Sequence, residues 1–294
     1  MKIPEFKIRT DLALEEREGL KEAAEEVSGV SFKKWEGKRS AAQITEVKVL
    51  NEHGAKALGK PMGSYLTLEA DKLLMPDEDF HSEVSDELAL LLKGLLKQKT
   101  GKNILVAGLG NQSVTPDSLG PRTVSNLCVS AEGLKAIAPG VMAQTGMETA
   151  RILLGIIKEV QPDLVIAIDA LAARTIQLTD TGIHPGSGVG NHRHSLTKET
   201  LGIPVLAIGV PTVVGAAAIV HDTISALLGV LSSQAETKNT GKWIQNMDPE
   251  DQYRLITELL EPEFGSLYVT PPDIDERVRQ LSFTISEGIH RALF

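Results

Sequence analysis

The sequence contains one cysteine, Cys128, so it cannot form an internal disulfide bond. Its first residues, MKIPEFKIRT, lack the apolar core of a secretory signal peptide. No apolar run reaches the roughly 18 residues that a membrane-spanning helix requires. These absences predict a cytoplasmic protein that does not insert into a membrane.

Basic residues are also in short supply. Lys and Arg number 30 against 39 Asp and Glu, which gives a formal net charge of -9. A nucleic-acid-binding surface needs clustered cations that face the phosphates. We therefore expect a protein or small-molecule partner and no nucleic acid.

Apolar runs separated by helical patterns predict the fold class. The runs NILVAGLG, DLVIAID and PVLAIGV have the appearance of buried strands. Thr145 and Glu148 have the T-x-x-E spacing of a capping box ahead of the helical segment ARILLGIIKEV. Strands that alternate with helices form βαβ units. The expected fold is therefore α/β, with a mostly parallel central sheet that carries helices on both faces.

Further segments extend this prediction. Residues 43–49 and 64–69 alternate polar and apolar positions, which predicts a small antiparallel N-terminal extension. Cys128 lies in the mostly apolar stretch TVSNLCV and is expected to pack in the core. Helical patterns cover about 12–27, 83–99, 213–233, 249–260 and 273–292.

The loop after the first central strand resembles a dinucleotide-binding loop only in part. Gly108 and Gly110 are present, but Ser113 occupies the third glycine position of G-x-G-x-x-G. Asp117 would place a negative charge near a bound phosphate. A nucleotide site is therefore not favoured, and the glycines could simply permit a tight turn.

Two aspartates stand at the ends of expected neighbouring strands. Asp117 could cap a helix, because acidic residues are favoured at helix starts. Asp169 ends the apolar run LVIAI, where an ionised carboxylate needs a partner, and Arg174 could supply one. Alternatively, the two carboxyl groups could share a proton, one activating water while the other polarises a peptide carbonyl.

A third loop, GIHPGSGVGN, is rich in glycine. Its exposed backbone amides around His184, Gly186, Ser187 and Gly188 could bind an oxyanion or a substrate strand. Ser187 is not in a G-x-S-x-G elbow, which gives a serine hydrolase little support. A metal site made of His184 and the two aspartates remains an alternative.

These segments together resemble the spore germination proteases of endospore-forming bacteria. The resemblance rests on GLGN, VTPDSLGP, APGVM, TGMET, DLVIAIDALAAR, DTGIHPGSGVGN, ETLGIPVLAIGVPTVV and the N-terminal RTDLALE. It implies an endopeptidase that degrades small acid-soluble spore proteins in the spore core during germination. It also implies a homotetramer that needs no cofactor, and an atypical aspartic peptidase with Asp117 and Asp169 as the catalytic pair. Asn111, Arg174 and the glycine-rich loop would support the site.

The resemblance further implies a zymogen that processes itself. The family cuts after an acidic residue and before an apolar residue and alanine, and Asp11, Leu12 and Ala13 fit that order. We therefore expect residues 1–11 to form a pro-segment and residues 12–294 to form the peptidase domain. This chain is shorter than the family pattern between Asn126 and Pro139 and between Arg174 and Thr179, but the central strands should be retained.

The expected fold is also similar to that of hydrogenase-maturation peptidases. In those proteins a G-x-G-N loop follows the first strand, with an acidic residue six positions after the Asn, and Asn111 and Asp117 keep that spacing. Acidic and histidine side chains contact nickel there, so a metal-dependent peptidase is one alternative. A family member that binds spore proteins without cutting them is another.

Overall fold

The computed structural model describes the side chains of residues 28–58, 60–70, 77–96, 103–130, 133–171, 196–216, 219–220 and 267–294, and the backbone of residues 176–179. The chain forms two compact units. The larger contains residues 10–212 and 272–294, and the smaller contains residues 1–9 and 213–271. The helices expected over 12–27 and 249–260 lie outside the described residues.

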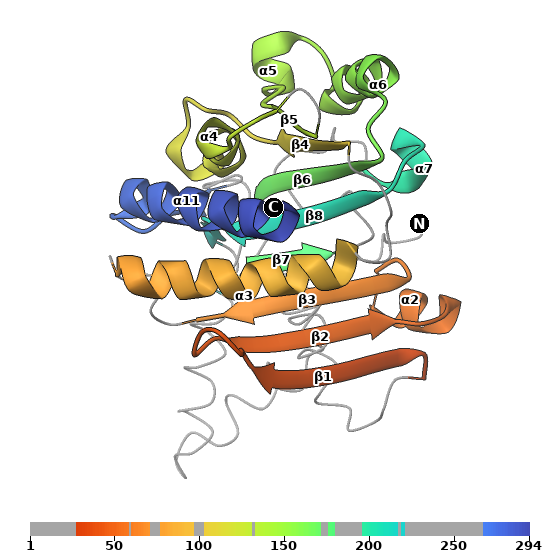
Figure 1. Ribbon diagram of the computed structural model, residues 1–294, viewed down its shortest axis with the longest axis vertical. Helices are drawn as coiled ribbons and strands as arrows, with labels where there is room; N and C mark the ends of the chain where they lie inside the picture. The colour runs from red at the N-terminus through yellow and green to blue at the C-terminus, as the bar shows by residue number, and fades with distance from the viewer. Residues whose placement is uncertain are drawn as a thin grey trace, which may run out of the picture. The chain divides into compact units, whose positions relative to one another are not determined.

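One sheet of eight strands organises the larger unit (Figure 1). Its strand order is β1-β2-β3-β7-β8-β6-β4-β5. The strands are β1 (Val30–Glu36), β2 (Gln43–Val49), β3 (Gly63–Glu69), β4 (Ile104–Gly108), β5 (Leu134–Ile137), β6 (Leu164–Leu171), β7 (Ile176–Thr179) and β8 (Val205–Pro211).

The predicted parallel sheet is confirmed. Strands β5, β4, β6 and β8 are neighbours and run parallel to one another. The three apolar runs of the sequence form β4, β6 and β8, each almost completely buried. Successive side chains of a strand point to opposite faces. Ile166 therefore packs into one core cluster, whereas Val165 packs into another.

Helices cover both faces of this sheet, as expected. The cluster that contains Ile166 is completed by α3 (Glu78–Leu96), α4 (Leu119–Asn126) and α11 (Ile274–Leu293). The cluster that contains Val165 is completed by α6 (Thr149–Val160) and α7 (Lys198–Leu201). Figure 1 shows α3 and α11 lying in front of the strands. The sequence predicted β4, β6, β8, α6 and α11 but neither β5 nor α4.

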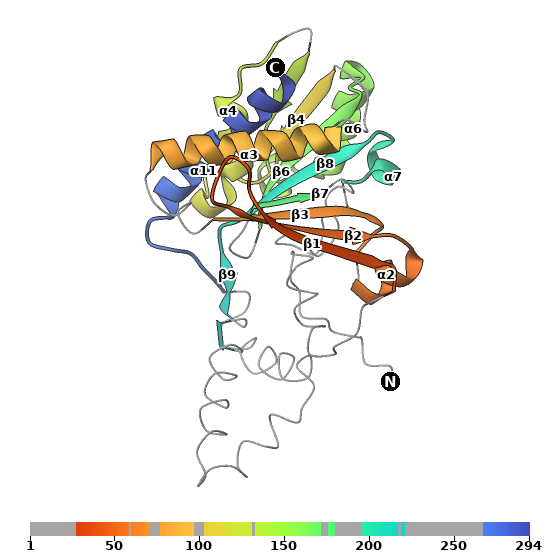
Figure 2. The same cartoon turned by 60° about the horizontal axis from the view of Figure 1, so that its bottom comes forward.

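The antiparallel extension is also confirmed (Figure 2). Strand β2 pairs antiparallel with β1 on one side and β3 on the other, with Val47 opposite Tyr65. Strand β3 then pairs with β7, which pairs antiparallel with β8. A small cluster packs Leu58, the last residue of α2 (Glu52–Leu58), against Val47, Val49 and Tyr65 of the sheet.

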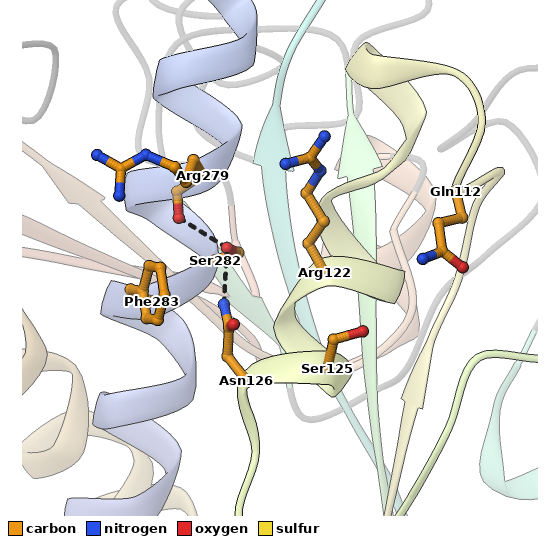
Figure 3. A pocket seen from close by; sticks show the side chains of 7 residues that line it. All are labelled: Gln112, Arg122, Ser125, Asn126, Arg279, Ser282 and Phe283. Atoms are coloured by element: carbon orange, nitrogen blue, oxygen red, sulfur yellow. Dashed lines mark hydrogen bonds between the residues drawn. The ribbon is translucent and has the colours of Figure 1, made fainter.

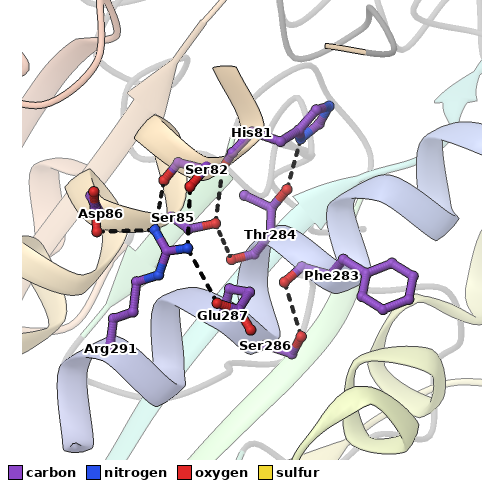
Figure 4. Close-up of polar contacts among 9 residues, drawn as sticks. All are labelled: His81, Ser82, Ser85, Asp86, Phe283, Thr284, Ser286, Glu287 and Arg291. Carbon is purple, nitrogen blue, oxygen red and sulfur yellow. Dashed lines mark hydrogen bonds and ion pairs between the residues drawn. The ribbon is translucent and has the colours of Figure 1, made fainter. Parts of the chain in front are cut away.

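Polar contacts join α11 to α3 (Figure 4). The buried His81 ring places Nδ1 2.7 Å from the hydroxyl oxygen of Thr284. Ser85 donates a hydrogen bond of 3.0 Å to the Thr284 carbonyl oxygen. Near the C-terminus, Arg291 donates to the Ser82 carbonyl oxygen at 2.9 Å and to the Asp86 carboxylate at 3.0 Å. These bonds hold α11 against α3.

Two helix starts differ from the sequence prediction. Helix α3 begins at Glu78, five residues before the expected start, because the Asp77 carboxylate accepts a hydrogen bond of 3.1 Å from the Phe80 amide. The capping box at Thr145 is wrong. Thr145 ends the short helix α5 (Met142–Thr145), and its hydroxyl accepts from the Met147 amide at 3.2 Å.

Two further expectations are corrected. Cys128 is exposed rather than packed, because α4 ends at Asn126 and the Cys128 amide then donates to His290 Nε2 at 3.0 Å. The helix expected from about Val213 begins later, at Ala216, because Val214–Gly215 forms strand β9 in the smaller unit. It pairs antiparallel with β10 (Tyr268–Val269).

Candidate active site

The loop after β4 folds back onto Asp117. Gly110 has a φ of +114°, and a Cβ atom there would lie 2.0 Å from the Asp117 carbonyl oxygen. Only glycine fits this conformation and this contact. The backbone amide of Asn111 donates a hydrogen bond of 2.7 Å to the Asp117 carboxylate. The loop therefore holds Asp117 with its backbone.

Asp117 ends a single 3-10 turn, η2 (Thr115–Asp117), in which Pro116 supplies a favourable fixed φ. The hydroxyl of Ser118 closes the turn by donating to the Thr115 carbonyl oxygen at 2.8 Å. The N-cap of α4 is Ser118, so the interpretation of Asp117 as a helix cap is wrong. Asp117 is half-buried.

Gly120 brings this turn against the end of β6. A Cβ atom at position 120 would lie 2.4 Å from the Leu109 carbonyl oxygen and 2.6 Å from that of Ile168. The Leu109 amide also donates to the Ile168 carbonyl oxygen at 2.8 Å. The backbone of α4 therefore packs directly on the peptide that precedes Asp169.

Asp169 lies on β6 opposite Gly209 of β8, and only 1% of its surface is exposed. One carboxylate oxygen accepts a hydrogen bond of 3.0 Å from the Ala170 amide. Cα atoms of η2 approach Cα atoms of β6 within 8 Å. The two aspartates therefore come from neighbouring strand ends at the same edge of the sheet, where sites of α/β proteins form.

The structure adds Gln144, which the sequence prediction missed. Its side-chain amide donates a hydrogen bond of 2.6 Å to the side-chain oxygen of Asn111. That oxygen also accepts from the Ser113 amide at 3.0 Å. Helix α5 thus holds the loop that holds Asp117. The only signal for this contact was the occurrence of Gln144 between the APGVM and TGMET motifs.

Several expected site residues lie outside the described part of the chain. They are Asp11, Leu12, Arg174, His184, Gly186, Ser187 and Gly188. Within the described residues, no group of three or more His, Cys, Asp or Glu side chains could hold a metal ion. No helix in the described ranges is long and apolar enough to cross a membrane.

Comparison with known proteins gives consistent matches. Residues 8–244 match a family model described as Germination protease. The germination protease of Caldanaerobacter subterraneus subsp. tengcongensis is 47% identical over 308 residues, covering 97% of this chain and 94% of that protein. The germination protease of Clostridium perfringens strain ATCC 13124 is 41% identical, covering 98% and 95%. That of Clostridium tetani is 40% identical, covering 97% and 95%. These matches do not favour the metal-dependent or the non-catalytic alternative.

A crystal structure of the NiFe hydrogenase maturation protease HycI from Thermococcus kodakarensis KOD1 also aligns. It is 21% identical and covers 42% of this chain and 80% of that one. The TM-score is 0.32, which is too low to support a conclusion about the fold or the site.

Proposed function

The chain belongs to the germination protease family and is therefore a peptidase, and on that premise we propose that Asp117 and Asp169 are its catalytic pair. The observation that supports the proposal is that the turn holding Asp117 packs beside β6, which carries Asp169, and that the two aspartates differ in exposure. Asp117 is half-buried, whereas Asp169 is 1% exposed.

The difference in exposure supports an assignment of roles. We propose that Asp169 is the acid of the pair because its side chain is buried. We propose that Asp117 is the base because it is more accessible to water. Asp117 takes a proton from water as the water oxygen attacks the peptide carbonyl, and Asp169 gives its proton to the carbonyl oxygen. In the second step Asp117 protonates the leaving amine, and Asp169 recovers its proton as the carbonyl reforms.

The substrate and setting follow from the resemblance. The proposed substrates are small acid-soluble spore proteins, which the enzyme would cut in the cytoplasm of the spore core at the start of germination. Arg174, His184, Gly186, Ser187 and Gly188 would shape the substrate groove. We further propose a homotetramer, which light scattering during size-exclusion chromatography would measure.

Zymogen control is a further part of the proposal. Residues 1–11 would form the pro-segment and residues 12–294 the peptidase domain, with self-cleavage between Asp11 and Leu12. The sequence Asp-Leu-Ala at 11–13 supports this assignment.

The test of the catalytic pair is cleavage of a purified small acid-soluble spore protein, followed by mass spectrometry. We expect Asp117→Asn and Asp169→Asn each to lower the rate by about 100- to 10,000-fold. Asp79→Asn, an exposed aspartate on α3, serves as the matched control and should cleave at the wild-type rate. Near-normal cleavage by both site variants would exclude the pair.

A further inference from the structure

A pocket of about 270 Å³ lies between α4 and α11, beside the loop that holds Asp117 (Figure 3). Arg122 and Asn126 line it from α4, Ser282 and Arg279 from α11, and Gln112 from the loop after β4. Figure 3 shows Arg122 between Gln112 on one side and α11 on the other. All of these residues belong to the larger unit.

Arg122 is a half-buried cation in this pocket. Its Nε atom donates a hydrogen bond of 3.1 Å to the Ser118 hydroxyl oxygen. No carboxylate among the described residues forms an ion pair with it, although the chain has an excess of acidic residues. The remaining guanidinium donors have the planar fork geometry that binds a carboxylate through two hydrogen bonds.

Several other polar groups of the pocket have partners within the protein. Glu276 binds the Arg279 guanidinium through both carboxylate oxygens. The Asn126 side chain donates to the Ser282 hydroxyl oxygen at 3.0 Å, and that hydroxyl donates to the Arg279 carbonyl oxygen. Arg122 is therefore the cation of this pocket that is best placed to receive a ligand.

Covalent connections place the pocket next to the proposed base. Gln112 directly follows Asn111, whose amide binds the Asp117 carboxylate. Ser118, which accepts from Arg122, directly follows Asp117. The Arg122 side chain thus contacts the residue next to Asp117, which supports contact of both residues with one bound peptide.

We propose that this pocket binds a side-chain carboxylate of the polypeptide substrate, with Arg122 as the residue that selects for it. The proposal rests on the catalytic site proposed above. Arg122 donates two hydrogen bonds to the carboxylate, and Gln112 lines the same pocket. Arg122 determines specificity and takes no part in proton transfer.

The test uses two peptides taken from this chain. Residues 6–14, FKIRTDLAL, contain Asp11 as the only acidic side chain. The peptide is acetylated and amidated at its ends, and its partner carries Asp11→Asn. The purified chain, after activation by removal of residues 1–11, should cleave the Asp peptide with a kcat/KM about 10- to 100-fold above that of the Asn peptide.

Three variants locate the selectivity. In Arg122→Gln the ratio between the two peptides should fall to about one. Arg122→Lys keeps the positive charge but lacks the planar guanidinium group. Its ratio of kcat/KM between the two peptides should lie between those of the wild type and Arg122→Gln. Arg151→Gln on α6 changes a highly exposed arginine and should keep the wild-type ratio. Circular dichroism confirms that each variant is folded.

The experiments distinguish an error in the proposed pocket from an error in the proposed catalytic pair. A wild-type preference that persists in Arg122→Gln, or equal cleavage of both peptides, overturns the pocket and leaves the catalytic pair intact. If neither peptide is cleaved, isothermal titration calorimetry measures the affinity of each peptide for the wild type and for Arg122→Gln. Tighter binding of the Asp peptide that Arg122→Gln abolishes supports the pocket without the catalytic pair. Absence of binding overturns the pocket.

Discussion

Gly110 and Asp117 are in backbone contact, since a Cβ atom at position 110 would lie 2.0 Å from the Asp117 carbonyl oxygen. We therefore expect Gly110→Ala to abolish peptidase activity and to lower the free energy of unfolding by about 2 kcal/mol. Alanine is disfavoured at this positive φ, and its Cβ atom would clash with the Asp117 carbonyl oxygen. Urea denaturation and a peptide assay measure the two effects.

The matched control is Gly155→Ala. Gly155 lies within α6, and a Cβ atom there would meet nothing within 4 Å. Alanine should raise the free energy of unfolding by about 0.5 to 1 kcal/mol and leave activity unchanged. A Gly110→Ala enzyme that retains activity would show that the loop conformation is not required.

Self-cleavage between Asp11 and Leu12 should remove the first eleven residues from the chain. Intact mass before and after activation measures this loss, and Asp11→Asn should slow it strongly because the acidic residue before the cut is removed. Asp169→Asn should not process itself at all. An unchanged N-terminus in the active wild-type enzyme would contradict the prediction.

Gln144 supports the loop through one hydrogen bond to Asn111. Gln144→Ala should lower kcat/KM by about 3- to 10-fold, because a neutral hydrogen bond contributes about 1 kcal/mol. Gln43→Ala removes a comparable bond, from the Gln43 amide to the Trp35 carbonyl oxygen, far from the loop in the sheet order. It should affect stability alone. Equal kinetic effects of both variants would argue against a role for Gln144 in the site.

Gly288 allows α11 to approach α3 closely. A Cβ atom there would lie 2.6 Å from a methyl carbon of Leu88. Gly288→Ala should therefore lower the free energy of unfolding by about 1 to 3 kcal/mol through overpacking. Gly94→Ala on α3, which meets nothing within 4 Å, should stabilise the protein instead. Thermal unfolding of the two variants should shift in opposite directions.

The Arg279 guanidinium, which binds Glu276, holds the pKa of that carboxyl below its ordinary value of 4.5. The pair therefore contributes stability above pH 4.5, and this contribution is lost as the pH falls through the lower pKa of the folded state. In Arg279→Gln the pKa of Glu276 should rise toward 4.5, as measured by NMR titration. A titration that does not move would contradict the pairing.

The sequence alone determined the central architecture and the two candidate aspartates. Apolar runs long enough for strands, separated by helical patterns, identified β4, β6 and β8 because burial on both faces requires uninterrupted apolar residues. The alternation of polar and apolar residues in 43–49 and 64–69 identified β2 and β3, because successive side chains of a strand point to opposite faces. Parallel strands end at one sheet edge, so Asp117 and Asp169 could be assigned to the same site.

Tertiary structure decided the contacts between segments that are distant in the sequence. The Gln144 bond to Asn111 and the placement of Arg122 opposite α11 depend on how helices pack on the sheet. Cys128 is exposed for the same reason, since the end of α4 and the position of His290 determine its surroundings. Local sequence patterns indicate whether a residue will be buried and whether it will be helical. Which side chain it contacts depends on how distant segments pack in the folded chain.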